Sequence, residues 1–104
     1  ERTLRTLRRT VPAAVPGIAF LSGGQSDELA TAHLDAMNKI GGAPWALTFS
    51  YGRALQHPAL TSWKGSAGNV AVAQRVLHHR ARMNGLATLG QYRTELEKDL
   101  GKAA

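Results

Sequence analysis

The chain has 104 residues, 13 basic and seven acidic side chains, a formal net charge of +6, 43% hydrophobic residues and no cysteine. This length suits one small domain, and the apolar fraction is too high for a disordered tail. The lack of cysteine excludes a disulfide scaffold, a thiol nucleophile and a zinc–thiolate site, and no apolar run approaches the roughly 20 residues that span a bilayer. The chain opens in charged helical sequence without an initiator Met or a signal-peptide pattern, so we expect a cytoplasmic protein cut from within a longer one.

A basic surplus raises the possibility of a nucleic-acid partner, because phosphate neutralisation is a common reason for it. Neither basic group is interleaved with the aromatic side chains that stack on bases, and neither lies in a recognisable binding motif. We therefore expect solvated helix faces rather than a nucleic-acid interface. The two groups are Arg2, Arg5, Arg8 and Arg9, and Arg75, Arg80 and Arg82.

The first half of the chain predicts a helix, a strand and a second helix. Apolar spacing predicts a helix over residues 1–10, which Pro12 and Pro16 end. The continuous apolar run 17–21 is typical of a parallel strand buried on both faces. A turn at 22–24 follows, then Ser26 as the N-cap of a helix that the glycines at 41–42 end.

The second half repeats this order. Residues 45–50 predict a strand, and a short helix should begin at 51–53, with His57-Pro58 interrupting it or starting a new one. A flexible loop is expected over 65–68, and a long helix from Asn69, as its N-cap, to Leu89. The polar tail from Gln91 predicts a last helical turn or two and then a frayed end.

Helical spacing also predicts which side chains are buried. The helix before residue 41 should bury an apolar face that includes His33 as a packed side chain. Trp45 and Trp63 are expected in the core or between helices. The two expected faces are Leu29, Ala32, His33, Ala36, Met37 and Ile40, and, in the long helix, Val70, Ala73, Leu77 and Ala81.

Strands that alternate with helices indicate parallel βα units, here two of them between an initial and a final helix. A two-stranded parallel sheet has two open edges and cannot bury the apolar faces of its helices. We therefore expect residues 1–104 to be a segment of a larger α/β fold and not a complete domain.

Glycine and serine follow both strands. Ser22-Gly23-Gly24 comes after the first, and Ser50-Tyr51-Gly52-Arg53 after the second, each just before a helix. Free amides, a helix N-terminus and a hydroxyl favour phosphate at such a place, and an arginine can bind two phosphate oxygens at once. Each turn alone could be a plain strand-to-helix connection; together, and with Arg53, they predict an anion site.

These same residues carry a resemblance. Residues 20–26, FLSGGQS, and 44–56, PWALTFSYGRALQ, closely resemble the class I, Schiff-base fructose-bisphosphate aldolases, and residues 7–12, LRRTVP, resemble the family's segment ahead of the first block. The resemblance runs in order from about residue 7 to 92. It implies an α/β fold, the C-terminal part of a TIM (βα)8 barrel made of its last two βα units plus the terminal helices.

The resemblance also implies a function. The family cleaves fructose 1,6-bisphosphate to dihydroxyacetone phosphate and glyceraldehyde 3-phosphate through a lysine imine. The residues that match those holding the ketose-end phosphate are Ser22, Gly23, Ser50, Gly52 and Arg53. The imine lysine and the acid–base carboxylates would precede residue 1, and Lys39 and Lys64 are not substitutes. A homotetramer is a further implication.

Some family features are not matched, and some alternatives stay open. Eukaryotic members end in a functional tyrosine, whereas this chain ends in residues 101–104, GKAA, and Tyr92 matches an earlier tyrosine. His78 and His79 diverge by about 100° on a helix, and class I chemistry uses no metal, so we expect neither a metal nor a cofactor. A stand-alone phosphosugar- or anion-binding module and a basic nucleic-acid-binding domain are the alternatives.

Overall fold

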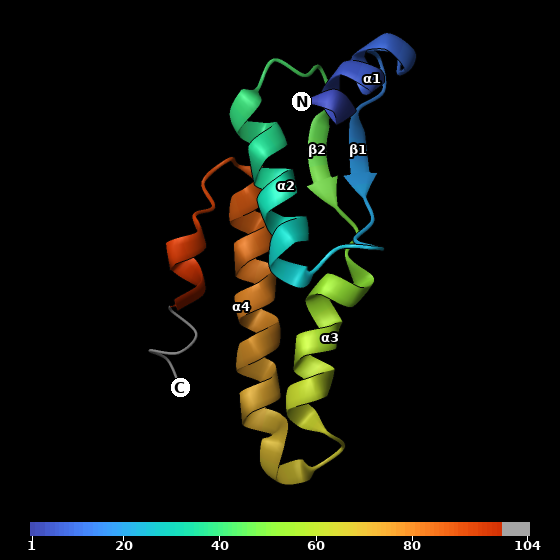
Figure 1. Cartoon of the computed structure of the whole chain (residues 1–104). Coiled ribbons are helices and arrows are strands. Elements are labelled where there is room, and N and C mark those ends of the chain that lie inside the picture. The colour runs from blue at the N-terminus through green and yellow to red at the C-terminus, as the bar shows by residue number, and fades with distance from the viewer. Residues whose placement is uncertain (99–104) are drawn as a thin grey trace.

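The structure, a computed structural model, describes residues 1–98. Two strands and four α-helices follow one another in the predicted order (Figure 1). Two short 3-10 helices, η1 and η2, flank the last α-helix. The elements are α1 (Arg2–Thr10), β1 (Gly17–Phe20), α2 (Asp27–Ile40), β2 (Ala46–Phe49), α3 (Gly52–Trp63), η1 (Ala67–Asn69), α4 (Val70–Thr88) and η2 (Thr94–Lys98).

The two strands form a parallel pair, as predicted. The register runs from Gly17 opposite Ala46 to Phe20 opposite Phe49, and the Ser50 amide donates to the Phe20 carbonyl at 2.8 Å, one residue beyond the pair. Parallel pairing brings the carboxyl ends of both strands to one edge of the sheet. The loops before α2 and α3 therefore start side by side.

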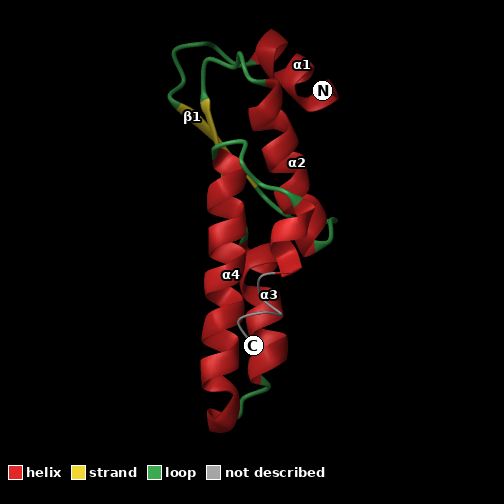
Figure 2. Cartoon of the chain, turned by 90° about the vertical axis from the view of Figure 1, so that its left-hand side faces the viewer, coloured by secondary structure: helices red, strands yellow, loops and turns green. Residues whose placement is uncertain are grey.

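The prediction that the strands are buried on both faces is wrong within the described residues. Along β1, Gly17 and Ala19 are exposed, whereas Ile18 and Phe20 are half-buried and pack on the core. The helices pack against one face of the sheet and leave the other open (Figure 2).

The core lies between α2, α4 and the inner face of the sheet. Trp45 is buried as predicted, and its Nε1 donates to the Pro12 carbonyl at 2.9 Å, which ties the start of β2 to the segment after α1. The helices α3 and α4 form an antiparallel pair that extends past the sheet and gives the molecule its length (Figure 1). The core residues are Leu4, Ala30, Leu34, Met37, Trp45, Leu47, Tyr51, Ala54, Met83, Ala87 and Tyr92.

The limits of α2 follow its sequence. The Ser26 side chain accepts a hydrogen bond from the Leu29 amide at 3.2 Å, so the predicted N-cap is confirmed. At the other end Gly41 has φ of 70°, a left-handed angle that glycine adopts without strain.

The predicted apolar face of α2 is confirmed only for Met37, which is buried, and Ala32, which is half-buried against the core; the rest of it is wrong. Leu29 and Ile40 are exposed, and His33 lies in solvent with its Nδ1 2.5 Å from Oε1 of Gln25. Two polar side chains, Thr31 and Asp35, take their place on the buried face because partners on α4 and the C-terminal segment satisfy them. The buried residues of α2 are Ala30, Thr31, Leu34, Asp35 and Met37.

The predicted inner side of α4 is also wrong apart from Ala73, which is half-buried. Val70 and Leu77 are exposed, and Arg80, predicted to be solvated, is buried. Its Nη2 donates to the Asp27 carbonyl at 3.2 Å and to the Thr31 hydroxyl at 2.5 Å. The buried residues of α4 are Val76, His79, Arg80, Met83, Asn84 and Ala87.

The expected interruption at His57-Pro58 is also wrong, since α3 runs through Pro58 without a break. It ends at Trp63, and its C-cap Lys64 has a left-handed φ of 55°; the loop that follows contains η1. Asn69 precedes α4 as predicted, but its side-chain Nδ2 donates back to the Trp63 carbonyl at 3.1 Å, and the side chain does not cap α4. Trp63 itself is 42% exposed.

The segment after α4 packs on the outer side of α2 and α4 (Figure 1). The predicted final helical turn is confirmed as η2, but Tyr92, just before it, is buried rather than part of a solvated tail. Its amide donates to Asp35 at 2.9 Å and its carbonyl accepts from Lys39 at 2.9 Å. The predicted frayed end and the sequence GKAA lie outside the described residues, within which no helix could cross a membrane.

Candidate anion site at the carboxyl ends of the strands

The two loops that the sequence singles out meet at the carboxyl ends of β1 and β2. Residues 21–26 lead from β1 into α2, and residues 50–51 lead from β2 into α3. Because the strands are parallel and paired, all five predicted site residues lie at this edge of the sheet. The structure thereby brings together residues 27 to 31 positions apart in the chain.

Arg53 connects the two loops. It is the second residue of α3, and its Nη2 donates to the Ser22 carbonyl at 3.0 Å and to the Gln25 carbonyl. Its Nη1 lies 3.8 Å from Oδ1 of Asp27 at the start of α2. The side chain is 45% exposed, so the guanidinium is anchored on one side and open to solvent on the other.

Ser22 joins the loops from the other direction. It is buried, and its Oγ accepts a hydrogen bond from the Ala54 amide at 3.4 Å. This takes one of the first-turn amides of α3, which have no intrahelical acceptor. The other predicted serine, Ser50, is exposed beside it.

Glycine at this edge keeps space open. A Cβ added at Gly23, Gly24 or Gly52 would meet no atom of the described residues within 4 Å. Gly24 has φ of 80°, which demands glycine, whereas Gly23 and Gly52 have no such angle. Neither backbone strain nor packing within residues 1–98 explains glycine at these two exposed positions, which leaves room for a ligand to approach the backbone.

Tyr51 attaches the second loop to α2. Its hydroxyl donates to the Ala30 carbonyl at 3.0 Å, and its ring lies 5.6 Å from that of Phe49. Burial raises the pKa of the Tyr51 phenol, since ionisation would place a charge in the core. The residue before Gly52 is therefore fixed to α2, and the N-terminus of α3 with it.

Two contributors to this edge escaped the sequence-based prediction. Asp27, an acidic residue in the first turn of α2, and the Gln25 carbonyl both contact Arg53, and neither is among the predicted site residues. The sequence does hold a signal for Asp27: a carboxylate directly after an N-cap and close to a predicted phosphate loop affects the binding of an anion to that loop.

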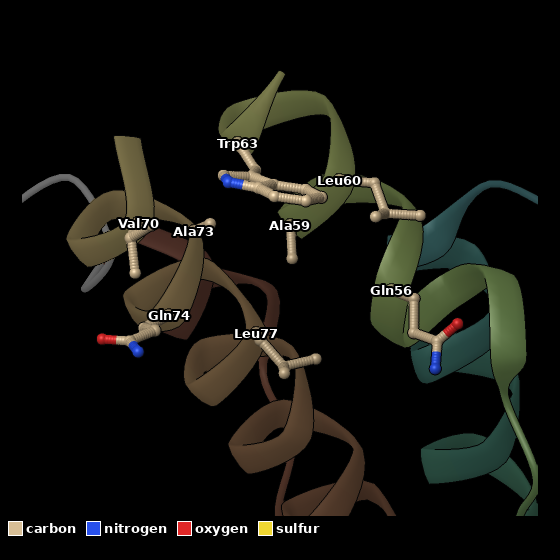
Figure 3. Close-up of a pocket in the computed structure, with 8 residues that line it drawn as sticks. All are labelled: Gln56, Ala59, Leu60, Trp63, Val70, Ala73, Gln74 and Leu77. Carbon is tan, nitrogen blue, oxygen red and sulfur yellow. The ribbon is translucent and has the colours of Figure 1, made fainter. Parts of the chain in front are cut away.

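A second feature lies away from this edge, between α3 and α4. Leu60, Trp63 and Leu77 line an apolar hollow of about 540 Å³ (Figure 3). The hollow offers hydrophobic surface and the two amides of Gln56 and Gln74, and no charged side chain lines it. Its chemistry suits packing rather than phosphate binding.

Residues 1–98 contain no group of three His, Asp or Glu side chains placed to hold a metal ion. His78 is exposed, and the Nε2 atom of its neighbour His79 lies 2.9 Å from Oε1 of Glu97. The two imidazoles thus have different surroundings.

Comparison with known proteins assigns the family. The model for fructose-bisphosphate aldolase class-I matches residues 1–104. The chain is 59% identical to fructose-bisphosphate aldolase of Plasmodium falciparum (isolate K1 / Thailand) over 91 residues, which are 88% of this chain and 25% of that protein. It is 55% identical to fructose-bisphosphate aldolase 1 of Caenorhabditis elegans over 98 residues, which are 93% of this chain and 27% of that protein.

A solved structure agrees in three dimensions. The fructose-bisphosphate aldolase from Plasmodium falciparum, determined in complex with TRAP and a small-molecule inhibitor, superposes with a TM-score of 0.85 at 59% identity, over 88% of this chain and 26% of that one. The fold is thus that of a segment of an aldolase. This chain belongs to the class I fructose-bisphosphate aldolase family, and it spans about a quarter of the length of the curated relatives it matches.

Proposed function

We propose that this chain is the C-terminal part of a class I fructose-bisphosphate aldolase, and that residues 1–104 supply the last two βα units and the terminal helices of its TIM barrel. The uncovered surfaces support this proposal. The sheet has two strands with open edges and one open face within the described residues. Exposed Leu21, Leu29 and Leu60, and the hollow between α3 and α4, give further barrel units apolar surface to cover.

The two loops at the carboxyl ends of the strands bind the ketose-end phosphate of the substrate. The observation that carries this proposal is the position of Arg53, which spans from the N-terminus of α3 to the loop after β1 and keeps part of its guanidinium in solvent. The open glycines, Gly23 and Gly52, let a phosphate reach backbone amides, and Ser50 adds an exposed hydroxyl. Ser22 holds the loops together and supplies its buried hydroxyl at their junction.

The reaction is the reversible cleavage of fructose 1,6-bisphosphate to dihydroxyacetone phosphate and glyceraldehyde 3-phosphate, in glycolysis and gluconeogenesis. By the family's chemistry, a lysine condenses with the ketose carbonyl to an imine, which accepts the electron pair of the breaking carbon–carbon bond. That lysine lies on an earlier strand, outside this chain. Residues 1–104 position the phosphate and, alone, have no aldolase activity.

Lys39 and Lys64 are poorly placed for imine chemistry. Lys39 is engaged by Asp35 at 2.7 Å and by the Tyr92 carbonyl at 2.9 Å, on the outer side of α2. Lys64 is the C-cap of α3, at the opposite end of that helix from the strand ends. The complete enzyme is cytoplasmic and works without a metal or cofactor, and the family's homotetramer is its expected assembly.

Borohydride trapping tests the assignment. The complete protein is incubated with dihydroxyacetone phosphate, reduced and digested, and the modified lysine is mapped by mass spectrometry. We expect one reduced adduct on a lysine that precedes residue 1, and no adduct when the isolated 104 residues are treated in the same way. An adduct on Lys39 or Lys64, or the absence of any adduct in the complete protein, would overturn the assignment.

Binding assays with the complete protein and with the isolated 104 residues distinguish the aldolase from the two alternative classes of function. A stand-alone anion-binding module would bind phosphosugars with the isolated chain and would form no imine. A nucleic-acid-binding domain would retain a duplex oligonucleotide with a strong dependence on salt. Either result, in a protein that does not cleave the bisphosphate, would replace the aldolase assignment.

A further inference from the structure

The guanidinium of Arg53 has a limited number of donors left for a ligand. An arginine has five N–H groups, two of them on Nη2. Both hydrogen bonds that this guanidinium makes within residues 1–98 start from Nη2, toward the Ser22 and Gln25 carbonyls. The donors that remain for a phosphate are those of Nη1 and Nε.

Asp27 lies at those remaining donors. Its Oδ1 is 3.8 Å from Nη1 of Arg53, and this oxygen is buried without a hydrogen-bond partner in the described residues. The Asp27 side chain is 16% exposed, so solvent screens its charge only in part. A carboxylate oxygen that has no other partner can accept a hydrogen bond from the guanidinium beside it.

Two hydrogen bonds hold the backbone of Asp27 in place. Its carbonyl accepts from the Arg80 guanidinium at 3.2 Å and from the Thr31 hydroxyl at 3.1 Å. Asp27 also starts α2 directly after the Ser26 N-cap. The carboxylate is thereby held at one place beside the phosphate loop, while the tip of Arg53 is half-exposed.

We propose that Asp27 is a positioning residue that competes with the substrate's phosphate for Nη1 of Arg53. This inference rests on the proposed function of the loops. In the empty site Asp27 and Arg53 neutralise each other and hold the guanidinium against the loop after β1. A phosphate that carries two charges displaces the carboxylate from Nη1, whereas a singly charged anion does so less well. Asp27 thus weakens anion binding and makes it depend on the charge of the anion.

The test measures the dissociation constant of inorganic phosphate by calorimetry, with the complete protein at pH 8 and fixed ionic strength. Exposed and partly exposed ion pairs contribute a few tenths to one kcal/mol, so Asp27→Asn should tighten phosphate about two- to fivefold. Asp27→Glu keeps the charge and should stay within about twofold of the wild type.

Glu28→Gln is the matched control. It removes the same charge from the same first turn of α2, at an exposed residue. It should change phosphate affinity by less than about 1.5-fold, because a solvated charge is largely screened. Equal tightening by Glu28→Gln and Asp27→Asn would overturn the proposal in favour of a general charge effect.

The Arg53→Ala background shows whether Asp27 acts through Arg53. There, Asp27→Asn should no longer tighten phosphate; tightening by the same factor would mean direct repulsion and would overturn the proposal. If Arg53→Ala leaves phosphate binding unchanged, the proposed phosphate site is wrong and the role of Asp27 falls with it. If Arg53→Ala weakens binding but Asp27→Asn fails to tighten it, only the role of Asp27 is wrong.

Discussion

Nη1 of Arg80, on α4, lies 2.9 Å from Oε1 and 2.5 Å from Oε2 of Glu97, in η2. The two side chains are 4% and 20% exposed, and Nε2 of His79 is 2.9 Å from the same Oε1. A charge-assisted pair with so little solvent attaches the C-terminal segment to α4. The same guanidinium reaches the first turn of α2 through the Asp27 carbonyl, so three elements depend on one side chain.

Replacement of Arg80 should therefore be costly. Arg80→Met keeps much of the side-chain volume but leaves the Glu97 carboxylate and the Thr31 hydroxyl without this donor. We expect the free energy of unfolding in urea to fall by about 3 kcal/mol, as when one member of a buried pair is removed. Arg75→Met, at an exposed position of the same helix, should change it by less than about 0.5 kcal/mol. Similar losses for the two variants would mean that Arg80 is in effect a solvated charge.

Ser22→Ala tests the hydrogen bond between the loops. The variant leaves the buried Ala54 amide without its acceptor, so we expect a loss of about 1 kcal/mol in the free energy of unfolding. Ser50→Ala removes an exposed hydroxyl from the same edge and should lose less than half of that. If Ser22→Ala is as stable as Ser50→Ala, the hydroxyl of Ser22 does not hold α3 in place.

Pro58→Ala should stabilise the protein. Proline in a helix interior is about 3 kcal/mol less favourable than alanine, and it gives back about 1 kcal/mol by restricting the unfolded chain. A net gain of about 2 kcal/mol is expected, with a higher melting temperature, because the amide restored at position 58 can donate to the Ala54 carbonyl. A lower melting temperature would show that the half-buried proline ring packs better than an alanine methyl group.

The local signals in the sequence predicted the elements well. Ser26, the glycines at 41–42 and the prolines after α1 act within a few residues, and α2 begins and ends where they indicate. The convergence of the two loops also follows from sequence, because parallel strands must place their carboxyl ends together. What those loops bind remains a prediction.

The buried faces were not predictable in this way. Arg80, Asp35 and Thr31 are buried because each has hydrogen-bond partners on another element. Those partners are 17 to 57 positions away in the chain, so the spacing of residues within one helix cannot predict them. The apolar residues assigned to the core instead, such as Leu29 and Leu77, lie on faces that are open in residues 1–98. Pro58 was read as a local signal, but the packing of α3 on α4 overrides it.

The pKa of Tyr92 predicts a dependence of stability on alkaline pH. Burial, and the Glu97 carboxylate near the phenol, raise this pKa from 10 to about 12. The fold therefore favours the neutral phenol, and this contribution is complete below pH 10 and is lost as the pH rises from 10 to 12. Unfolding free energies of the wild type and Tyr92→Phe should change in parallel up to pH 10, after which the wild type should fall faster. Parallel curves up to pH 12 would contradict the shift.

Arg53→Ala in the complete enzyme is the most direct measure of the phosphate site. A charge-assisted pair to a partly desolvated phosphate contributes roughly 1.5–3 kcal/mol, so kcat/KM for fructose 1,6-bisphosphate should fall on the order of tenfold to a hundredfold. A ketose without the phosphate at that end should lose much less, and Arg53→Lys should fall in between, because lysine keeps the charge but not the two-pronged geometry. Imine trapping with excess ketose should survive, since the lysine lies elsewhere. Equal losses for phosphorylated and unphosphorylated substrates would assign Arg53 to the junction of Ser22 and Gln25 with α3 rather than to the phosphate.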